Sequence, residues 1–182
     1  MEKKLDKAAV VLTKLMEVAH WIGAVGTLVG LVLLLTMGER ALVSPVAEAN
    51  EELAIYGFRM TVADGVGNPD LGALKALLMV GVANLILMAL VFRNVHRILK
   101  NTEGGTPFQP DNIRMVREIG YFLMAVPVVG LTASGLIRLI LGVDLVESSV
   151  DMPFLVIGLV ALCLSRVFAR GMELETETEG LL

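Results

Sequence analysis

Four long apolar segments limit what this chain can fold into more than any other feature of its sequence. Short stretches that hold most of the charged residues separate them. A helix needs about 20 mostly apolar residues to cross the hydrocarbon of a bilayer, and a strand would leave backbone groups unpaired in lipid. The sequence therefore predicts an all-α integral membrane protein with four transmembrane helices, at roughly residues 16–38, 71–93, 111–141 and 152–170.

The composition is that of one membrane domain. Hydrophobic residues make up 55% of the 182 residues, whereas a soluble domain holds about 45–50%. The fourth segment is the shortest, and it can span if Arg166 extends toward the headgroups. Cys163 is the only cysteine, so no intrachain disulfide is available. The first segment is longer than the apolar core of a signal peptide and lacks a clean cleavage site, so we expect a retained helix.

The distribution of lysine and arginine predicts how the helices are oriented. The first outer loop, residues 39–70, has only Arg40 and Arg59. Basic residues gather instead at the N-terminal flank, between helices two and three, and at the final flank: Lys3, Lys4, Lys7, Lys14, Arg93, Arg97, Lys100, Arg114, Arg117, Arg166 and Arg170. Because basic loops stay inside, both termini, an elbow at residues 94–118 and an acidic tail at residues 171–182 should be cytoplasmic.

The two outer loops are expected to form a small extracytoplasmic region. Residues 44–53 read as a short helix with Ser44 as its N-cap. The next stretch, AIYGFRMTV, is rich in strand-forming residues, and the second loop, residues 142–151, is also compatible with a strand. We therefore expect the two loops to cover one another with some short β-pairing. This region is either irregular and without a ligand, or a specific surface that senses a ligand; the sequence leaves both alternatives open.

Two polar residues fall at membrane depth. Asn84 is central in the second helix, and a lipid-facing amide would be costly, so it should face the bundle and form an interhelical hydrogen bond. Arg138 lies near the outer end of the third helix, where it can extend toward the headgroups or pair with Asp144 or Glu147.

Two further positions bear on helix shape and packing. Pro127 removes a backbone donor inside the third helix and should bend it. The glycines of Gly26–Gly30 have the spacing that lets two helices approach closely, and we expect them to pack within this bundle.

Little in the sequence points to chemistry. His20 and His96 are the only candidates for a haem or metal, and His96 should lie beyond the second helix on a solvated basic face. No paired carboxylates, nucleophile motif or phosphate-binding loop is present, so we predict a non-enzymatic protein without cofactor or metal. A haem-binding redox protein is one alternative. Another is a small transporter or channel subunit whose path is lined by Asn84, Pro127, Thr132 and Ser134.

The elbow contains a device for starting a helix. Within NTEGGTPFQPDNIRMVREIG, residues 101–120, Gln109 can serve as N-cap and Pro110 as the first helical residue, where its missing donor costs nothing. Phe108 and Ile113 have the spacing of a hydrophobic staple. Arg114 and Arg117 share a charged face of the following helix. The result should be a rigid, charged elbow at the membrane surface.

Two stretches resemble a known family. GGTPFQPDNIRMVREIG and SRVFARGMELETETEG are similar to segments of the bacterial membrane proteins grouped as domain of unknown function 2975, although the ending EGLL departs from the family's pattern. The resemblance implies a four-helix bundle in the bacterial plasma (inner) membrane, and a small Cro-type helix-turn-helix regulator as partner. The residues carried over are Pro107, Phe108, Ile119, Gly120, Phe168, Gly171 and Glu175.

The acidic tail is compatible with such a partner. An anionic inner leaflet would repel its glutamates, whereas a basic DNA-binding protein would be attracted to them. An acidic tail that is solvated and binds no partner is an equal alternative to a tail that binds a regulator. The leading hypothesis is a membrane sensor or regulator that does not itself bind nucleic acid. The sequence leaves open whether the protein forms a homo-oligomer. Its expected partner-binding residues are Pro107, Phe108, Arg114, Arg117, Glu173, Glu175, Glu177 and Glu179.

Overall fold

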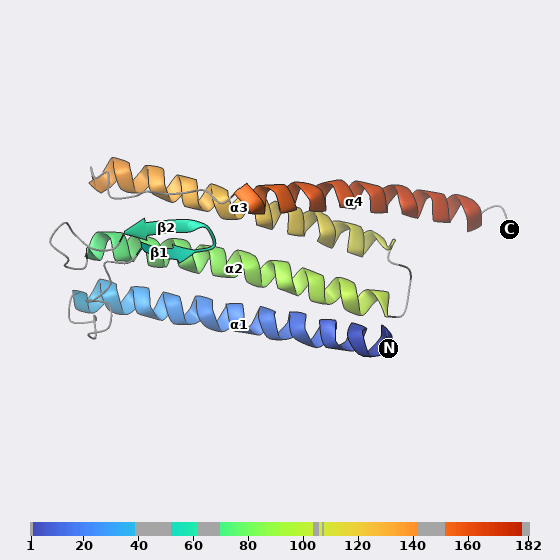
Figure 1. Cartoon of the computed structure of the whole chain (residues 1–182), viewed down its shortest axis with the longest axis horizontal. Coiled ribbons are helices and arrows are strands. Elements are labelled where there is room, and N and C mark those ends of the chain that lie inside the picture. Colours follow the sequence, from blue (N-terminus) through green and yellow to red (C-terminus); the bar gives the residue numbers. More distant parts are fainter. Residues whose placement is uncertain are drawn as a thin grey trace. The chain divides into compact units, whose positions relative to one another are not determined.

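The computed structural model describes residues 2–38, 52–61, 70–103, 106, 108–141 and 152–179. Its elements are α1 (Glu2–Met37), β1 (Glu52–Ile55), β2 (Phe58–Thr61), α2 (Leu71–Thr102), α3 (Pro110–Leu141) and α4 (Met152–Glu179), as Figure 1 shows. All four helices are long and apolar enough to cross a membrane. The chain is therefore helical with four candidate spans, as predicted, and has the build of a multi-pass membrane protein.

The helices extend beyond the apolar segments that predicted them. α1 begins at Glu2 rather than near residue 16, and α2 continues to Thr102. α4 runs through most of the expected acidic tail and ends at Glu179. Lysine, arginine and glutamate are good helix formers, so the charged flanks continue the helices. Hydropathy marks the part of a helix that suits lipid, and it does not mark where the helix ends.

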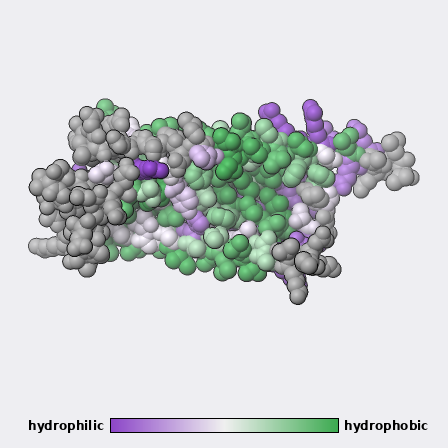
Figure 2. All heavy atoms as spheres, in the orientation of Figure 1, coloured by the Kyte–Doolittle hydropathy of each residue, from purple (hydrophilic) through white to green (hydrophobic). Residues whose placement is uncertain are grey.

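The exposed surface of the helices suits lipid. Large apolar side chains are exposed along α1 and α4, whereas Met79 is the only one so exposed among the described residues of α2. In the most apolar window of each helix, 44% of the α2 residues are buried but only 11% of those in α4. Figure 2 shows hydrophobic side chains over much of the helical surface, and hydrophilic ones on the C-terminal part of α4. Contiguous apolar surface of this kind belongs against a membrane or another protein.

The contacts divide the chain into two compact units. Unit 1 comprises Met1–His20, Leu87–Ala125 and Pro153–Leu182, and unit 2 comprises Trp21–Ile86 and Val126–Met152. α1, α2 and α3 each contribute to both units. α3 passes from one unit to the other beside Pro127, which is buried within the continuous helix. The bend expected at Pro127 stays a prediction.

Unit 2 contains a β-hairpin. β1 pairs antiparallel with β2 in a register that places Ile55 opposite Phe58. The turn between them consists of Tyr56, with φ of 48°, and Gly57, with φ of 80°. Two successive left-handed residues match the right-handed twist of the flanking strands. Burial raises the pKa of the Tyr56 phenol above its ordinary value.

The hairpin corrects part of the outer-loop prediction. Glu52 and Leu53 belong to β1, so the short helix expected at residues 44–53 is wrong at its end. A hairpin turn that uses φ > 0 at both central positions strongly favours strands on either side. The rest of that expected helix and the second loop, residues 142–151, lie outside the described residues. Pairing between the two loops stays a prediction.

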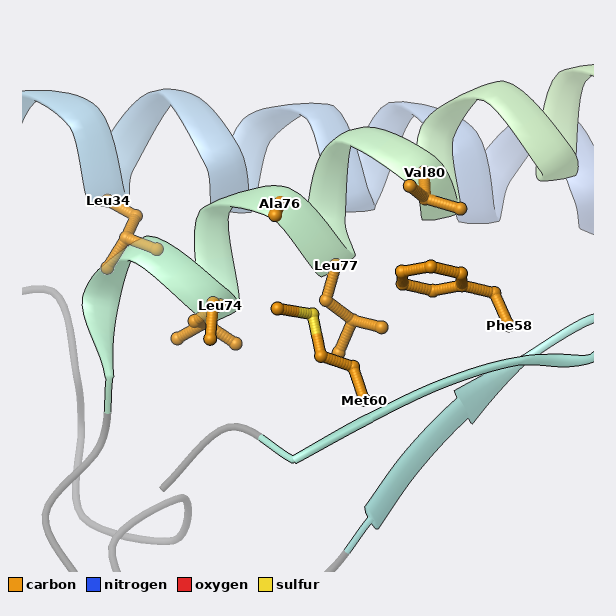
Figure 3. Close-up of a cluster of buried hydrophobic side chains, with 8 residues drawn as sticks. Leu34, Phe58, Met60, Leu74, Ala76, Leu77 and Val80 are labelled. Carbon is orange, nitrogen blue, oxygen red and sulfur yellow. The ribbon is translucent and has the colours of Figure 1, made fainter. Parts of the chain in front are cut away.

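The hairpin helps to close a hydrophobic core in unit 2. Phe58 and Met60 are buried while Arg59 between them is exposed, which is the period of a strand with one covered face. Figure 3 shows Met60 beside Leu77 and Phe58 directed toward Val80 on α2. The same core includes Leu34 of α1 and the N-terminal residues of α2: Ala73, Leu74 and Ala76.

Asp70 fixes the start of α2 over this core. Its Oδ1 atom accepts hydrogen bonds from the backbone N–H groups of Gly72 at 2.7 Å and Ala73 at 3.1 Å. These are donors that a helix leaves unpaired at its first turn, so Asp70 is an N-cap. The cap holds Ala73 and Leu74 in place, where they pack under the hairpin.

Asn84 is buried as predicted, but the expected interhelical hydrogen bond is wrong. The residue is 0% exposed, and neither Oδ1 nor Nδ2 has a hydrogen-bond partner among the described residues. One turn away on α2, a Cβ atom on Gly81 would meet the end of the Ile55 side chain at 3.0 Å and the Thr27 methyl group at 3.5 Å. The side chain of Arg138 lies outside the described residues, as do Asp144 and Glu147, so the placement expected for this arginine stays a prediction.

The glycine pair of α1 does not pack as expected. A Cβ atom built on Gly26 or Gly30 would meet nothing within 4 Å in the described part of the chain. The spacing is therefore not used for a close helix contact within unit 2. Close approach occurs elsewhere, between two glycines that are far apart in the sequence.

Candidate functional site

The close contact lies in unit 1, between α3 and α4. A Cβ atom on Gly120 would lie 2.8 Å from the Leu162 side chain and 2.9 Å from the carbonyl oxygen of Gly158. A Cβ atom on Gly158 would lie 2.7 Å from Met124. The two backbones touch here because neither residue has a side chain. Gly120 came from the family resemblance, and Gly158 was missed because no second small residue marks the spacing.

The start of α3 is as the sequence predicted, whereas α2 continues to Thr102, past its expected end near residue 93. The Thr102 hydroxyl donates to the carbonyl oxygens of Ile98 and Leu99 in the last turn of α2. α3 begins at Pro110, and the N–H of Ile113 donates to the Gln109 carbonyl oxygen at 3.1 Å. This first helical bond confirms Gln109 as the residue that precedes the helix.

Five residues fasten this connection to α4, and we call them the elbow cluster: Thr106, Phe108, Phe168, Gly171 and Glu175. The rings of Phe108 and Phe168 are 5.6 Å apart and nearly perpendicular, a favourable aromatic geometry. A Cβ atom on Gly171 would lie 2.9 Å from Cε1 of Phe108, so the absence of a side chain there makes room for the ring. The Thr106 hydroxyl donates to Oε2 of Glu175 at 3.1 Å and accepts from the Phe108 N–H at 3.2 Å.

The elbow cluster brings together four of the residues carried over from the family resemblance. Phe108 precedes Phe168, Gly171 and Glu175 by 60 to 67 positions in the sequence, and the contacts of the cluster bring them together. Of the other three, Ile119 is half-buried on α3 and Gly120 touches α4, as described above. Pro107 lies outside the described residues.

The acidic residues of α4 do not form one surface. Glu173 and Glu177 are both exposed and lie about one helical turn apart, so they share a face. Glu175, between them, is half-buried and held in the elbow cluster. The side chain of Glu179 lies outside the described residues. The structure therefore divides a set of glutamates that the alternating sequence presented as equivalent.

The two arginines of the elbow differ in their contacts. Arg114 lies 3.9 Å from a carboxylate oxygen of Asp111 and 3.5 Å from one of Glu118. Arg114 and Asp111 are exposed on α3, and Glu118 is half-buried. The charge of Arg114 is therefore balanced locally. Arg117 makes no ion pair in the described part of the chain, and it borders a groove between α3 and α4. Arg114 and Arg117 are both exposed and three residues apart on α3, so a shared face is compatible with the helix, and a joint binding role stays a prediction.

Asparagines join α2 to α3 in unit 1, and the sequence reasoning missed them. Nδ2 of Asn94 donates to Oε2 of Glu118 at 3.0 Å, and Nδ2 of Asn101 donates to Oδ1 of Asn112 at 3.0 Å. Asn112 is 0% exposed and Asn94 is 5% exposed, so these bonds are sheltered. The seven-residue spacing of Asn94 and Asn101 puts both on one face of a helix, a signal that could have been read.

The histidines have structural surroundings in unit 1. His96 lies within α2, half-buried, and its Nδ1 donates to the carbonyl oxygen of Val10 at 3.1 Å. Its expected place on a solvated face beyond the helix is therefore wrong, because the charged residues continue α2. Nδ1 of His20 donates to the Met16 carbonyl oxygen, and the His20 ring lies 5.0 Å from that of Phe92.

One charged residue of α1 is also buried. Glu17 is 8% exposed, and one of its carboxylate oxygens lies 2.9 Å from Nζ of Lys14. The two residues are three positions apart, so the pair forms within one turn of α1. A buried carboxylate is costly unless it is paired, so the Lys14 ammonium group stabilises the charge of Glu17.

Comparison with known proteins adds one result. The family model described as "Protein of unknown function (DUF2975)" matches residues 46–180, which include β1, β2, α2, α3 and α4. No curated protein and no solved structure matches the chain.

Proposed function

The chain belongs to the DUF2975 family, and on that premise we propose that it is a non-enzymatic regulator in the bacterial plasma (inner) membrane. Its cytoplasmic face binds a small, basic helix-turn-helix transcription factor and keeps it from DNA. The exposed face of Glu173 and Glu177 on α4 is the binding surface, and the elbow cluster holds that surface in place.

The distribution of charge supports the orientation that this function needs. Lysines and arginines flank α1, the connection between α2 and α3, and the end of α4, whereas the hairpin loop has few. By the positive-inside rule, both termini and the elbow are cytoplasmic. The hairpin is then extracytoplasmic, where it could sense conditions outside the cell.

The helical continuation of α4 carries the proposal. A free tail would spread its glutamates over many conformations, but Glu173 and Glu177 project from a helix that the Phe108–Phe168 contact and the Thr106–Glu175 hydrogen bond fasten to the elbow. An anionic leaflet repels these carboxylates and favours their projection into the cytosol. A DNA-binding protein presents a basic face, and that face is complementary to an ordered pair of carboxylates.

The transporter alternative receives less support. The Thr132 hydroxyl donates to carbonyl oxygens of its own helix and is exposed, and the Ser134 hydroxyl donates to the Gly130 carbonyl oxygen. Their polar atoms are thus engaged within α3. Asn84 alone offers unpaired polar atoms among the expected path residues.

Co-purification tests the proposal. The tagged protein, extracted from its own host in mild detergent, should bring down a small basic helix-turn-helix protein that mass spectrometry identifies. We expect the double substitution Glu173→Gln and Glu177→Gln to remove most of that recovery. High salt or an added DNA duplex should also release the partner, because the attraction is electrostatic and competes with DNA.

The matched control removes the same charge from other positions. Asp6→Asn with Glu103→Gln also deletes two negative charges within unit 1, at exposed positions outside the elbow cluster. This control should recover the partner as well as the native chain does. Equal recovery with Glu173→Gln and Glu177→Gln, or the absence of any such protein, would overturn the proposal.

A further inference from the structure

A groove of about 430 Å³ lies between α3 and α4 in unit 1. Arg117 and Tyr121 border it on α3, and Leu159, Leu162, Cys163 and Arg166 border it on α4. A volume of this size is within the range of small-molecule sites, which is roughly 300–1,000 Å³. The partner surface proposed above, Glu173 and Glu177, does not contribute to it.

The groove has a charged end and an apolar end. Phe108 lies against Gly171 and Gly120 against Gly158, so α3 and α4 run antiparallel. Arg117 and Arg166 are therefore both on the side of the groove that faces the elbow. Leu162 and Leu159 follow about one and two turns farther along α4, away from the elbow. The gradient runs from guanidinium groups to aliphatic side chains along the helix axes.

The two guanidinium groups lack anionic partners in the described part of the chain. The ion pairs there engage Lys14 and Arg114, and neither Arg117 nor Arg166 makes a hydrogen bond or an ion pair. Both side chains are exposed. Two arginines that border one groove favour an anion beside them, and a phosphate can accept bidentate hydrogen bonds from a guanidinium group.

We propose that this groove binds one anionic phospholipid. The phosphate lies between Arg117 and Arg166, and an acyl chain follows Tyr121, Leu162 and Leu159. The surroundings favour a lipid over an acidic peptide, because both walls belong to helices apolar enough to cross a membrane and Leu159 is 57% exposed. Tyrosine and arginine at the ends of apolar segments are the residues that meet headgroups. The bound lipid bridges α3 and α4 next to the Gly120–Gly158 contact.

Native mass spectrometry of the purified full chain tests this site. Wild-type protein in micelles with equal amounts of phosphatidylglycerol and phosphatidylcholine should retain one phosphatidylglycerol per chain. Arg117→Gln with Arg166→Gln should weaken that retention roughly tenfold, because two charge-assisted contacts are lost. The control Arg114→Gln with Arg170→Gln removes equal charge from arginines that do not border the groove, and it should retain the lipid.

The native cysteine gives a second readout that needs no arginine variant. Cys163 borders the groove, is exposed, and is the only cysteine of the chain. Phosphatidylglycerol should slow its alkylation by N-ethylmaleimide several-fold in micelles, and equal phosphatidylcholine should not. This arm keeps the proposal testable if the double arginine variant does not fold.

Several results would overturn the proposal. They are equal retention of the two lipids by the wild-type chain, equal loss of lipid in both arginine pairs, and alkylation of Cys163 that responds to neither lipid. Protection of Cys163 that instead follows protein concentration, with a dimer in the native spectra, would assign the groove to a second copy and also reject the lipid. None of these outcomes depends on recovery of a transcription factor, so this test is separate from that of the proposed function.

Discussion

Two buried asparagines on α2 differ in how their polar atoms are satisfied. Asn84, in unit 2, is 0% exposed and has no hydrogen-bond partner among the described residues. Asn94, in unit 1, is 5% exposed and donates to Glu118. The sequence identified Asn84 because it interrupts an apolar run, but the same rule passed over Asn94, which follows Arg93 at the end of that run. Position along a helix predicts that an amide is buried, and it does not predict what the amide contacts.

These surroundings predict opposite effects of one substitution. Asn84→Leu should raise the stability of the protein in micelles by about 1–2 kcal/mol, since an unpaired buried amide is replaced by an apolar group of similar shape. Asn94→Leu should lower it by a similar amount, because the Glu118 carboxylate loses its donor. Thermal unfolding followed by circular dichroism measures both. A loss of stability with Asn84→Leu would show that its amide has a partner.

Glycines provide a second comparison at this scale. Gly120→Val should destabilise the protein by about 1–3 kcal/mol, because the new side chain meets Leu162 and the backbone of Gly158. Gly26→Ala should be neutral or stabilise by up to about 1 kcal/mol, since open space surrounds that position and alanine favours the helix. The same unfolding assay compares them. Equal costs at the two positions would contradict the assignment of the α3–α4 contact.

At the scale of elements, the β-hairpin is the part most sensitive to its turn. Tyr56 and Gly57 both adopt left-handed backbone conformations, and Tyr56 is half-buried. The strand propensity of AIYGFRMTV was readable from the sequence. The position of the turn was not, because tyrosine is uncommon at positive φ and gave no signal.

The buried tyrosine predicts a pH dependence for this element. Burial raises the folded-state pKa of Tyr56 above its ordinary value of 10.0, so the folded chain holds the proton more tightly than the unfolded chain. The stability is therefore fully present below about pH 10 and is lost as the pH rises through the folded pKa. In a Tyr121→Phe background, the absorbance of the remaining tyrosinate should appear above pH 10 and coincide with loss of stability. Tyr56→Phe should remove that loss, and ionisation at the ordinary pKa would contradict the burial.

The elbow shows how far local sequence rules reach. The helix start at Pro110 followed from residues next to one another, and the structure confirms it. The contacts of Phe108 with Phe168 and Gly171 could not be derived in this way, because they join segments whose proximity depends on the packing of α3 against α4. The family resemblance supplied those residues without their geometry. The division between Glu175 and its neighbours follows from the helical period of α4, which the sequence reading took for a tail.

At the scale of the whole molecule, hydropathy was sufficient to predict four helices and insufficient to predict their contacts. Apolar length gives a span, and basic flanks give an orientation, but lipid-facing and helix-facing residues are both apolar. The glycine motif at Gly26–Gly30 was misleading for this reason, and the contact between Gly120 and Gly158 had no comparable signal. The placement of His96 was wrong because the charged end of α2 is helical.

The proposed regulator requires the elbow and the end of α4 on one side of the membrane and the hairpin on the other. Single cysteines at Glu103, Glu177 and Arg59, each introduced in a Cys163→Ser background, can report this in intact cells with a maleimide that does not cross the inner membrane. Only Arg59→Cys should be labelled before lysis, and all three should be labelled after it. Labelling of Glu177→Cys or Glu103→Cys in intact cells would contradict the account. Protection of all three cysteines in intact cells would also contradict it, because Arg59 would then lie on the same side as the other two.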